Sequence, residues 1–492
     1  MNVNIPNGPT LCKHLVGGEW VYGEEKNIFG VVSPYNGKII GYATEADENL
    51  INEAIKKANE AFKDWKKTPI KERCQVLFRY RELMLKNIEE LSHIVASESG
   101  KTLDEAKAGI MKGLEVTEFA VSLQNMDQGA SMEVSRGVYC QMQRDPLGVV
   151  CGITPFNFPA MVPMWMFPIA LALGNSFVMK PSEKVPLTAQ KMAEYLMQAG
   201  LPKGVFTILN GKAATSQAII DHPLVKAVAF VGSTPVAKSV YQKATLHGKR
   251  SIALGGAKNP IILTPDADPS IAVRGIVDSF TGCAGQRCMA ASILLAVGDV
   301  DHIIEKIKEE ASKIVLSRNM GAIIDDNSLT RIMGILGRAE AEGAKIVLDG
   351  RSPAVPEELK GGYWLGPTII DDVKPDMECA RTEIFGPVIA IIRVDNLSQA
   401  MAIESVNSFG NATSVFTSSG AVARHVATES QSGMIGINIG VPVPREPFSF
   451  GGTKDSKFGA CDITGESSLE FWGQLKKITT KWSPQQDENW MS

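Results

Sequence analysis

The chain has 492 residues, of which 44% are hydrophobic and 21% are charged, and its formal net charge at pH 7 is −4. This composition is typical of a globular protein, and at roughly 100–200 residues per domain the length predicts two to four domains. The small acidic charge excludes the strongly basic surface of nucleic-acid-binding proteins. The most apolar stretch, residues 160–178, is interrupted by Pro163, Pro168 and Gly174, so we expect no membrane span.

The cysteines and histidines indicate the cellular compartment and the kind of site to expect. Eight cysteines are spread along the chain without CxxC or paired spacing, which favours reduced thiols over a disulfide framework. The first residues, Met1 to Pro6, resemble neither a secretory signal nor a transit peptide, so we expect a cytoplasmic protein. Six histidines form no HxH or HExxH set, and we therefore expect no metal site.

The first 125 residues are predicted to form a β-hairpin followed by three long helical regions. The Asn36-Gly37 pair marks a turn between strands expected at residues 29–32 and 39–42. Apolar residues then recur at helical spacing in residues 45–65, 70–99 and 104–125. These helices need a sheet to pack against, and that sheet is expected in the next part of the chain.

From residue 148 the pattern changes to alternating strands and helices. Strands are expected at residues 148–153, 176–180, 205–210 and 225–231, and helices at 160–173, 186–200, 213–220 and 235–246. A second series follows Gly255-Gly256, with strands at 260–263, 293–297, 345–348, 388–394, 414–417 and 434–438, and helices at 269–279, 301–316, 327–342, 398–408 and 421–430. Because the strands are mostly apolar, the sequence predicts an α/β fold built on doubly wound parallel sheets that helices cover on both faces.

The last predicted strand lies near the C-terminus, at residues 475–482. It has no evident partner in the sequence around it. An unpaired strand edge can pair with the sheet edge of another subunit, so this segment is a candidate for subunit contact.

Cys288 is the first candidate for chemistry. A glycine-rich turn that begins at Gly282 leads into it, Arg287 precedes it, and an apolar strand follows. This arrangement presents a thiol at the end of a sheet, where a cation or backbone N–H groups favour the reactive thiolate. Taken alone, the local sequence favours a small buried apolar residue, which is what most cysteines are.

Three further motifs follow predicted strands. Gly232 and Ser233 precede a helix that Pro235 begins, which is typical of an anion-binding helix N-terminus or of a simple capped helix. Lys180 and Glu183 lie in a turn after a strand, where they are suited to bind ribose hydroxyls or to face solvent.

The third motif is the loop of residues 154–159, where two prolines and two phenylalanines surround Asn157. An amide held in this way is suited to donate to an oxyanion, although an asparagine in a rigid turn also bonds to its own backbone.

Together these motifs resemble the aldehyde dehydrogenase superfamily, whose order they follow along with Glu383-Ile384-Phe385-Gly386-Pro387. The resemblance implies two Rossmann-like α/β domains and a small β oligomerisation domain. Its NAD-binding domain would be residues 1–125 and 146–256, its catalytic domain 257–450, and its oligomerisation elements 126–145 and 470–492. It also implies a homotetramer, a dimer of dimers.

The resemblance further assigns roles to single residues. Cys288 would be the nucleophile, and Asn157 with the Cys288 backbone N–H would form the oxyanion hole. The cofactor NAD would be bound by Thr154, Phe156, Lys180, Ser182, Glu183, Gly232, Ser233, Glu383 and Phe385. Cys283, five residues before the nucleophile, is expected to be structural.

One departure from the superfamily pattern concerns how the product is released. Hydrolytic members carry a glutamate general base in a Glu-Leu-Gly-Gly-Lys motif, whereas the comparable position, 34 residues before Cys288, is Leu254, or Ala253 in the adjacent register. Neither side chain can take a proton from water. We therefore expect the thioester on Cys288 to be released to a thiol, because thiolates are strong nucleophiles near neutral pH.

This departure fits a branch that the sequence also resembles in five segments: residues 100–103, 256–259, 285–290, 438–459 and 474–482. The branch is that of the CoA-acylating malonate- and methylmalonate-semialdehyde dehydrogenases. The implied reaction is NAD-dependent oxidation of the semialdehyde, with CoA as co-substrate and loss of CO₂, giving acetyl-CoA or propionyl-CoA. Arg287 would bind the substrate carboxylate, and Lys112 stands where the branch has a second arginine. Arg445 is an alternative cation, although its position in the loop favours an ion pair with Glu446 or exposure to solvent.

Three alternatives remain open at this stage. The chain could act on another anionic short-chain aldehyde, such as another semialdehyde or a sulfonated aldehyde, because Lys112 departs from the pattern. It could be a hydrolytic dehydrogenase that releases the free acid, or a catalytically silent relative. Preference for NAD over NADP is also open.

Overall fold

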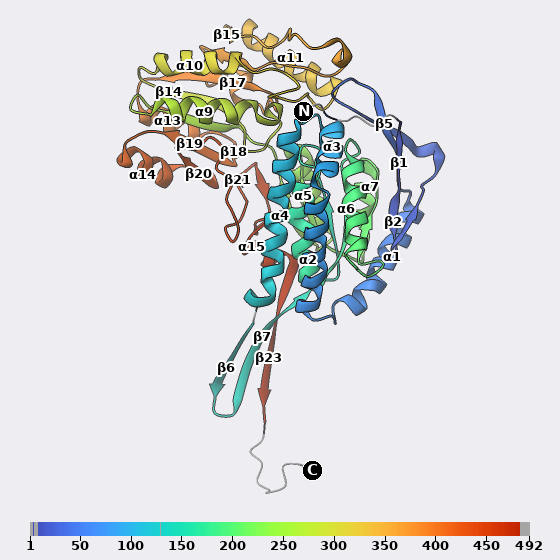
Figure 1. The fold of residues 1–492 in the computed structure, drawn as a ribbon. Coiled ribbons are helices and arrows are strands. Elements are labelled where there is room, and N and C mark those ends of the chain that lie inside the picture. The colour runs from blue at the N-terminus through green and yellow to red at the C-terminus, as the bar shows by residue number, and fades with distance from the viewer. Residues whose placement is uncertain (1–2, 4–7, 128, 483–492) are drawn as a thin grey trace, which may run out of the picture.

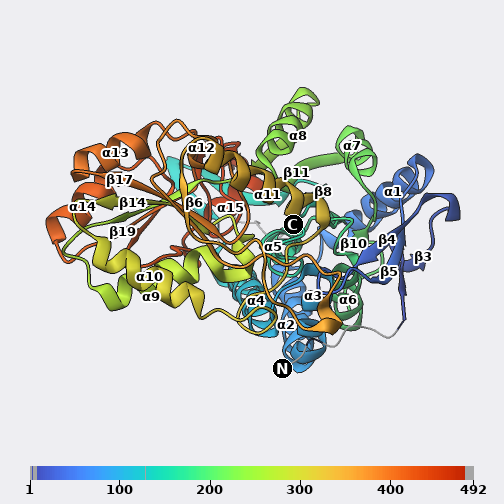
Figure 2. The same ribbon diagram turned by 90° about the horizontal axis from the view of Figure 1, so that it is seen from above.

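The computed structural model describes residue 3, residues 8–127 and residues 129–482 (Figure 1). These residues form two α/β units and a long β-arm that projects away from them. Seen from above, the two units lie side by side (Figure 2). Among the helices described, none is both long and apolar enough to cross a membrane.

The first unit contains an eight-stranded sheet whose five central strands run parallel. In spatial order its strands are β22 (Lys457–Phe458), β12 (Arg250–Leu254), β11 (Val225–Val231), β8 (Val149–Ile153), β9 (Ser176–Lys180), β10 (Phe206–Ile208), β2 (His14–Val16) and β3 (Glu19–Val21). Successive residues of β8 face opposite sides, so that Val150 joins one apolar cluster and Cys151 the other. A strand buried on both faces has to be apolar throughout, which explains its sequence.

Helices cover both faces of this sheet. One face is covered by α1 (Glu48–Trp65), α7 (Ala213–Asp221) and α8 (Thr234–Leu246). The other is covered by α2 (Ile70–Lys86), α3 (Ile88–Ser99), α4 (Leu103–Met126), α5 (Met161–Ala172), α6 (Pro186–Gln198) and α15 (Ser467–Trp472). The helix predicted for residues 70–99 is thus two helices, which meet at Asn87.

The second unit contains a seven-stranded sheet that is parallel except for one edge strand. Its order is β15 (Lys345–Leu348), β16 (Thr368–Asp371), β17 (Val388–Val394), β14 (Ala291–Val297), β13 (Asn259–Leu263), β19 (Ala412–Phe416) and β20 (Met434–Ile437). One face packs on α9 (Pro269–Thr281) and α10 (Asp301–Ser312), and the other on α11 (Asp326–Ala341), α12 (Glu378–Arg381), α13 (Leu397–Ser405) and α14 (Gly420–Glu429). The predicted fold class, with two doubly wound sheets, is therefore confirmed.

Five strands of these sheets were not predicted, namely β2, β3, β12, β16 and β22, of which β2, β3 and β22 have only two or three residues each. β12 begins with the polar residues Arg250 and Ser251, which interrupt the apolar pattern expected of a buried strand. β16 has only four residues and follows a long irregular segment. The remaining short elements are β1 (Thr10–Cys12), β4 (Ile28–Val32) and β5 (Ile39–Thr44), which form one small sheet, β18 (Phe409–Gly410) with β21 (Thr453–Lys454), and the 3-10 turns Glu25–Asn27, Gly282–Gly285 and Glu357–Leu359. The pairing of β4 with β5 confirms the hairpin predicted at Asn36-Gly37.

The arm is a three-stranded sheet made from two distant parts of the chain. β6 (Ala130–Ser135) and β7 (Val138–Pro146) form a hairpin, and β23 (Gly473–Lys481) pairs with β7 along its whole length. The C-terminal strand that had no evident partner in sequence therefore pairs within its own chain. Within the predicted elements 126–145 and 470–492, residue 128 and residues 483–492 lie outside the described residues.

Candidate active site

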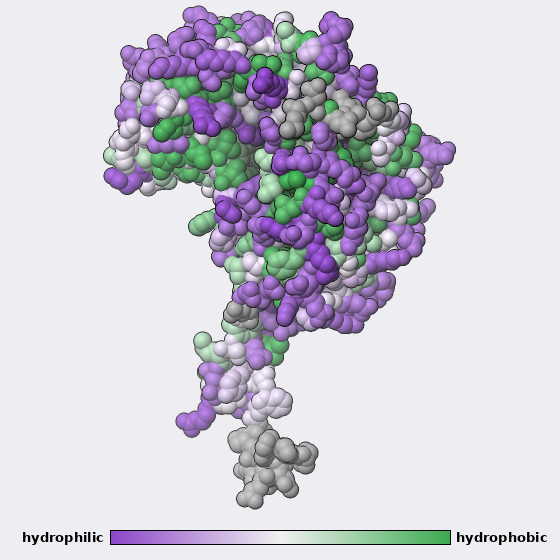
Figure 3. Space-filling view, in the orientation of Figure 1, coloured by the Kyte–Doolittle hydropathy of each residue, from purple (hydrophilic) through white to green (hydrophobic). Residues whose placement is uncertain are grey.

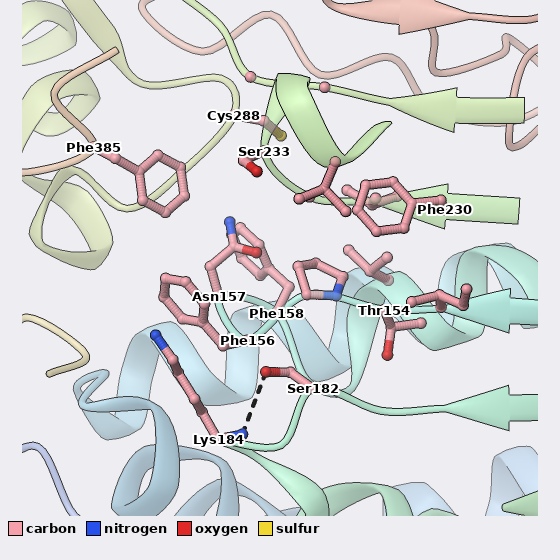
Figure 4. A pocket seen from close by; sticks show the side chains of 18 of the residues that line it. Thr154, Phe156, Asn157, Phe158, Ser182, Lys184, Phe230, Ser233, Cys288 and Phe385 are labelled. Atoms are coloured by element: carbon pink, nitrogen blue, oxygen red, sulfur yellow. Dashed lines mark hydrogen bonds between the residues drawn. The ribbon is translucent and has the colours of Figure 1, made fainter. Parts of the chain in front are cut away.

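A cavity of about 680 Å³ contains every residue that the sequence predicted for catalysis or cofactor binding (Figure 4). The first unit contributes the segments that follow β8, β9 and β11, because the carboxyl ends of parallel strands meet at one edge of a sheet. The second unit contributes Cys288, Glu383 and Phe385. The cavity therefore lies where the two units meet.

The N-terminus of α8 forms one end of this cavity. Ser233 is its N-cap residue, yet the serine side chain makes no capping hydrogen bond. Pro235 and Val236, in the first turn, also line the cavity. The free N–H groups and the partial positive charge of the helix terminus are thus available to an anion, which favours the anion-binding interpretation of this motif over a simple capped helix.

Lys180 and Glu183 lie beside this helix terminus. Lys180 is 4% exposed, and its Nζ donates to the carbonyl of Gly211 at 2.9 Å and lies 3.7 Å from Glu183 Oε2. Burial lowers the pKa of Lys180, and the neighbouring carboxylate of Glu183 opposes that shift. Because the Lys180 ammonium is buried, this turn does not simply face solvent. Glu183 is partly exposed and lines the cavity, so its carboxylate is available to a polar ligand.

The backbone before Cys288 adopts an uncommon conformation. Cys283, Ala284 and Gly285 are all left-handed, with φ of 54°, 52° and 68°. A Cβ at Gly285 would overlap the carbonyl of Gly386, so the loop and the Glu383–Pro387 motif approach too closely for any other residue. The Gln286 side chain accepts from the backbone N–H of Ile324 at 3.0 Å and donates to Ala322, which holds the turn rigidly.

Asn157 is held in the orientation that an oxyanion donor needs. Its Nδ2 donates one hydrogen to the Gln286 carbonyl at 2.9 Å, so its second hydrogen is directed elsewhere. In Figure 4 the amide nitrogen points toward the part of the cavity that contains Cys288. The asparagine therefore bonds to the nucleophile loop rather than to its own turn.

Charges and backbone N–H groups act on the Cys288 thiol in opposite directions. Burial, followed by the charge of Glu383, raises its pKa to about 12, while the N–H groups of Cys288 and Met289 and the charge of Arg287 lower it. Glu383 is itself desolvated, which raises its pKa, and it accepts from the Ala257 N–H at 2.9 Å. Burial and Glu383 therefore favour the thiol form of Cys288, whereas the two N–H groups and Arg287 favour the thiolate.

Sequence analysis missed several residues of this site. Arg331, on α11, donates to the carbonyls of Glu383 and Ile384 and fixes the segment that carries Phe385. Phe385 has a left-handed backbone, and its ring meets Phe156 edge to face at 6.0 Å. Lys184 directly follows Glu183 and also lines the cavity. Of these missed residues, it is the one that could have been predicted from the sequence, because it is next to the Lys180–Glu183 motif.

The Leu254 side chain is apolar and buried, so it offers no general base. It is 5% exposed and belongs to the apolar cluster against which Cys288 packs. Only the backbone that follows, Gly255 and Gly256, reaches the cavity lining.

The two cations expected at the substrate carboxylate are not part of the cavity lining. Arg287 donates from Nη2 to the carbonyls of Asp278 and Ser279 at the end of α9, and its buried Nε has no hydrogen-bond partner. Lys112 forms ion pairs with Glu115 at 2.9 Å and with Glu446 at 3.6 Å. Its charge is thus already compensated by two carboxylates.

Arg445 is largely exposed to solvent, which was one of the two interpretations favoured over a role as substrate cation, and it forms no ion pair with Glu446 among the described residues. Its Nε lies 3.8 Å from Glu115 instead, and the arginine side chain is 75% exposed.

Comparison with known proteins gives a consistent result over nearly the whole chain. Residues 20–478 match the model of the aldehyde dehydrogenase family. Malonate-semialdehyde dehydrogenase 2 of Geobacillus kaustophilus is 40% identical over 97% of this chain and all of its own length.

Two solved structures extend this result. A methylmalonate-semialdehyde dehydrogenase from Oceanimonas doudoroffii is 38% identical, with a TM-score of 0.95 over 97% of this chain and 99% of its own. A Sinorhizobium meliloti protein, provisionally named a methylmalonate-semialdehyde dehydrogenase and solved with NAD, is 35% identical, with a TM-score of 0.96 over 98% of this chain and all of its own. The chain belongs to the aldehyde dehydrogenase family.

Proposed function

We propose that this enzyme oxidises malonate semialdehyde or methylmalonate semialdehyde with NAD⁺ and transfers the acyl group to CoA with loss of CO₂. The observation that carries the proposal is a cavity that contains a cysteine and a fixed asparagine amide, with leucine where a base would promote hydrolysis. The names of the similar proteins from Geobacillus and Oceanimonas support the choice of substrate.

The cavity has the features that a dinucleotide requires. The α8 N-terminus with Gly232 and Ser233 would hold the pyrophosphate, Lys180 and Glu183 the adenosine ribose, and Glu383 with Phe385 the nicotinamide ribose and ring. Thr154, Phe156 and Ser182 would complete the binding surface. The cofactor, when bound, supplies the acceptor for the hydride that leaves the substrate.

The protein groups account for the remaining chemistry. The Cys288 thiolate attacks the aldehyde carbon, and the Asn157 amide with the Cys288 N–H donates to the oxyanion that forms. Loss of the hydride leaves an acyl group in thioester linkage to Cys288. The thiolate of CoA then attacks this carbonyl, forms a new thioester and releases the Cys288 thiolate. The bond between the substrate carboxylate and the neighbouring carbon breaks with loss of CO₂, and that carbon takes up a proton from solvent.

Arg287 directly precedes Cys288 and is the first candidate for binding the substrate carboxylate. Because its Nη2 donates to two backbone carbonyls and its Nε is buried outside the cavity lining, it would bind the substrate only after its side chain turned toward the cavity. Lys112 would contribute only if it exchanged Glu115 or Glu446 for the substrate. Because an ammonium is a point charge without the planar fork of arginine, Lys112 also favours a second candidate substrate class, other anionic aldehydes including sulfonated ones.

We also propose that the enzyme is a homotetramer, a dimer of dimers, in the reducing environment of the cytoplasm. The arm exposes Met132, Val134 and Tyr139, and the edge strand β20 exposes Ile437. Apolar residues also gather on the face of the second unit that Figure 3 shows. Apolar strand edges of this kind are suited to subunit contact. All eight cysteines are free thiols.

The domain boundaries implied by the resemblance remain part of this proposal. They assign residues 1–125 and 146–256 to cofactor binding, 257–450 to catalysis, and 126–145 with 470–492 to assembly. The first sheet also includes β22, which lies after residue 450 and pairs with β12, so part of the chain beyond residue 450 belongs with the cofactor-binding unit.

The decisive experiment measures NADH formation from both semialdehydes with and without CoA, and identifies the acyl products by mass spectrometry. We expect turnover to require CoA and to yield acetyl-CoA or propionyl-CoA. Undiminished turnover without CoA would refute acyl transfer. Turnover of a sulfonated aldehyde, with none of either semialdehyde, would refute the proposed substrate in favour of the sulfonated class. Light scattering of the purified protein tests the tetramer.

A further inference from the structure

The carbonyl oxygen of Cys288 accepts hydrogen bonds from two side-chain amides. Nδ2 of Asn259 lies 2.7 Å from this oxygen, and Nδ2 of Asn411 lies 2.8 Å from it. Both side chains are nearly buried, at 5% and 6% exposure. A peptide carbonyl beside a nucleophile needs no such pair of donors for folding, because one partner already satisfies a buried carbonyl.

The two amides come from adjacent strands of the second sheet and are themselves held in place. Asn259 is the first residue of β13; its Nδ2 also donates to the Ala290 carbonyl at 2.9 Å, and its Oδ1 accepts from the Ala412 N–H at 3.1 Å. Asn411 directly precedes β19, and its Nδ2 also contacts the Met289 sulfur at 3.1 Å. The two donors therefore converge on one oxygen from a rigid platform.

The geometry of a peptide group connects this oxygen to the reactive sulfur. The carbonyl of Cys288 and the N–H of Met289 belong to one planar unit and point in opposite directions. The Met289 N–H is one of the groups that lower the pKa of the Cys288 thiol. Fixing the oxygen therefore fixes the direction of this N–H, and donors on the oxygen polarise the unit and strengthen the N–H as a donor.

We propose that Asn259 and Asn411 are positioning residues that hold the Cys288–Met289 peptide with its N–H directed at the nucleophilic sulfur. They act through this peptide and contact neither substrate nor cofactor. The proposal rests on the assignment of Cys288 as nucleophile in the proposed function. It extends the site to two residues that belong to the second sheet and that the catalytic motifs do not include.

The test is the substitution Asn411→Leu, which preserves the approximate volume and removes one donor. Alkylation of the wild-type and variant proteins by iodoacetamide is followed at several pH values, and each cysteine is quantified by peptide mass spectrometry. We expect Cys288 to react about five- to tenfold more slowly in the variant, the effect of losing one hydrogen bond to the stabilised form. Cys140 and Cys461, half-buried thiols outside the cavity, are internal standards whose rates should not change.

Two controls separate positioning from loss of stability. Asn175→Leu removes an equally buried asparagine that donates to Ala170 and Trp472, and it should lower the unfolding temperature without slowing Cys288. Asn411→Ser retains a hydroxyl donor in a smaller side chain, so it provides a folded variant with an intermediate rate if the leucine variant does not fold.

Each outcome decides the proposal. A Cys288 rate unchanged in folded Asn411→Leu or Asn411→Ser would overturn it, and so would equal slowing of Cys288 and Cys461. Failure of the proposed function gives a different result, because NADH formation would then persist in Cys288→Ala, whatever the alkylation rates of the asparagine variants.

Discussion

Leu254→Glu tests whether the missing base determines how the thioester is released. Leu254 ends β12, is almost fully buried, and belongs to the cluster against which Cys288 packs. Position 254 pairs directly across the strand with Lys457 on β22, whose ammonium already pairs with Asp462. Directly opposite residues in antiparallel strands project to the same face, so a glutamate introduced here would have a cation within reach.

The structure sets the size of both expected effects. Replacing a buried leucine with a carboxylate costs about 2–4 kcal/mol of stability, which Lys457 partly offsets. A positioned general base contributes roughly 10²–10⁴-fold to rate. We expect a gain near the lower end, about 100-fold in CoA-independent turnover, because a neighbouring ammonium lowers the pKa of a carboxyl group and makes it a weaker base.

The assay records NADH formation without CoA, together with release of the free acid. Leu254→Gln is the matched control: it is similar in size and polarity to glutamate but cannot accept the proton, so CoA-independent turnover should stay at the wild-type level. If folded Leu254→Glu shows no gain over Leu254→Gln, the absence of a base at this position does not limit hydrolysis, and the reasoning from the sequence departure is refuted.

Three further predictions concern the thiol, the oxyanion hole and a buried lysine. Cys288→Ala should abolish NADH formation, measured by absorbance, and retained activity would remove the nucleophile assignment. Asn157→Ala should lower kcat about 10²–10³-fold with little change in NAD binding, as expected when one oxyanion donor is lost. Lys258 is fully buried, its Nζ has no hydrogen-bond partner among the described residues, and burial lowers its pKa to about 8. Between pH 8 and 10.5 the unfolded chain therefore binds a proton that the folded protein has released. Lys258→Met should stabilise the protein by about 3 kcal/mol below pH 8, and the gain should disappear as pH rises to 10.5. Denaturant unfolding across this range would contradict the idea if the gain did not depend on pH.

The order of strands and helices could be predicted because two physical patterns are local. Apolar strands such as Val225–Val231 and amphipathic helices such as Glu48–Trp65 carry their periodicity within a few residues. β12 was missed because polar residues at its start hide a strand that β22 covers at the sheet edge. Long-range pairing, like that of β23 with β7, leaves no comparable local pattern.

The candidate site divides in the same way. Residues that directly follow strands, such as Lys180 and Ser233, could be grouped in advance because strand ends meet at one edge. Arg331 and Asn411 could not, because their roles depend on carbonyl groups that only the tertiary structure brings near them. The charge of Lys112 was visible in the sequence, but its pairing with Glu446 was not.

The connection between the two sheets explains why nucleophile reactivity and thioester release can be separated. Residues 254–259 run from the end of β12 to the start of β13. Within them Gly256 leaves room for the Glu383 carboxylate, Ala257 donates to it, and Asn259 holds the Cys288 carbonyl. These contacts are made by the backbone of Gly256 and Ala257 and by the side chain of Asn259. The Leu254 side chain takes no part in them and packs in the apolar core. A change at Leu254 can therefore alter the fate of the acyl group while the contacts that position Cys288 remain intact, so acyl transfer and hydrolysis can differ between relatives without changing how the thioester is formed.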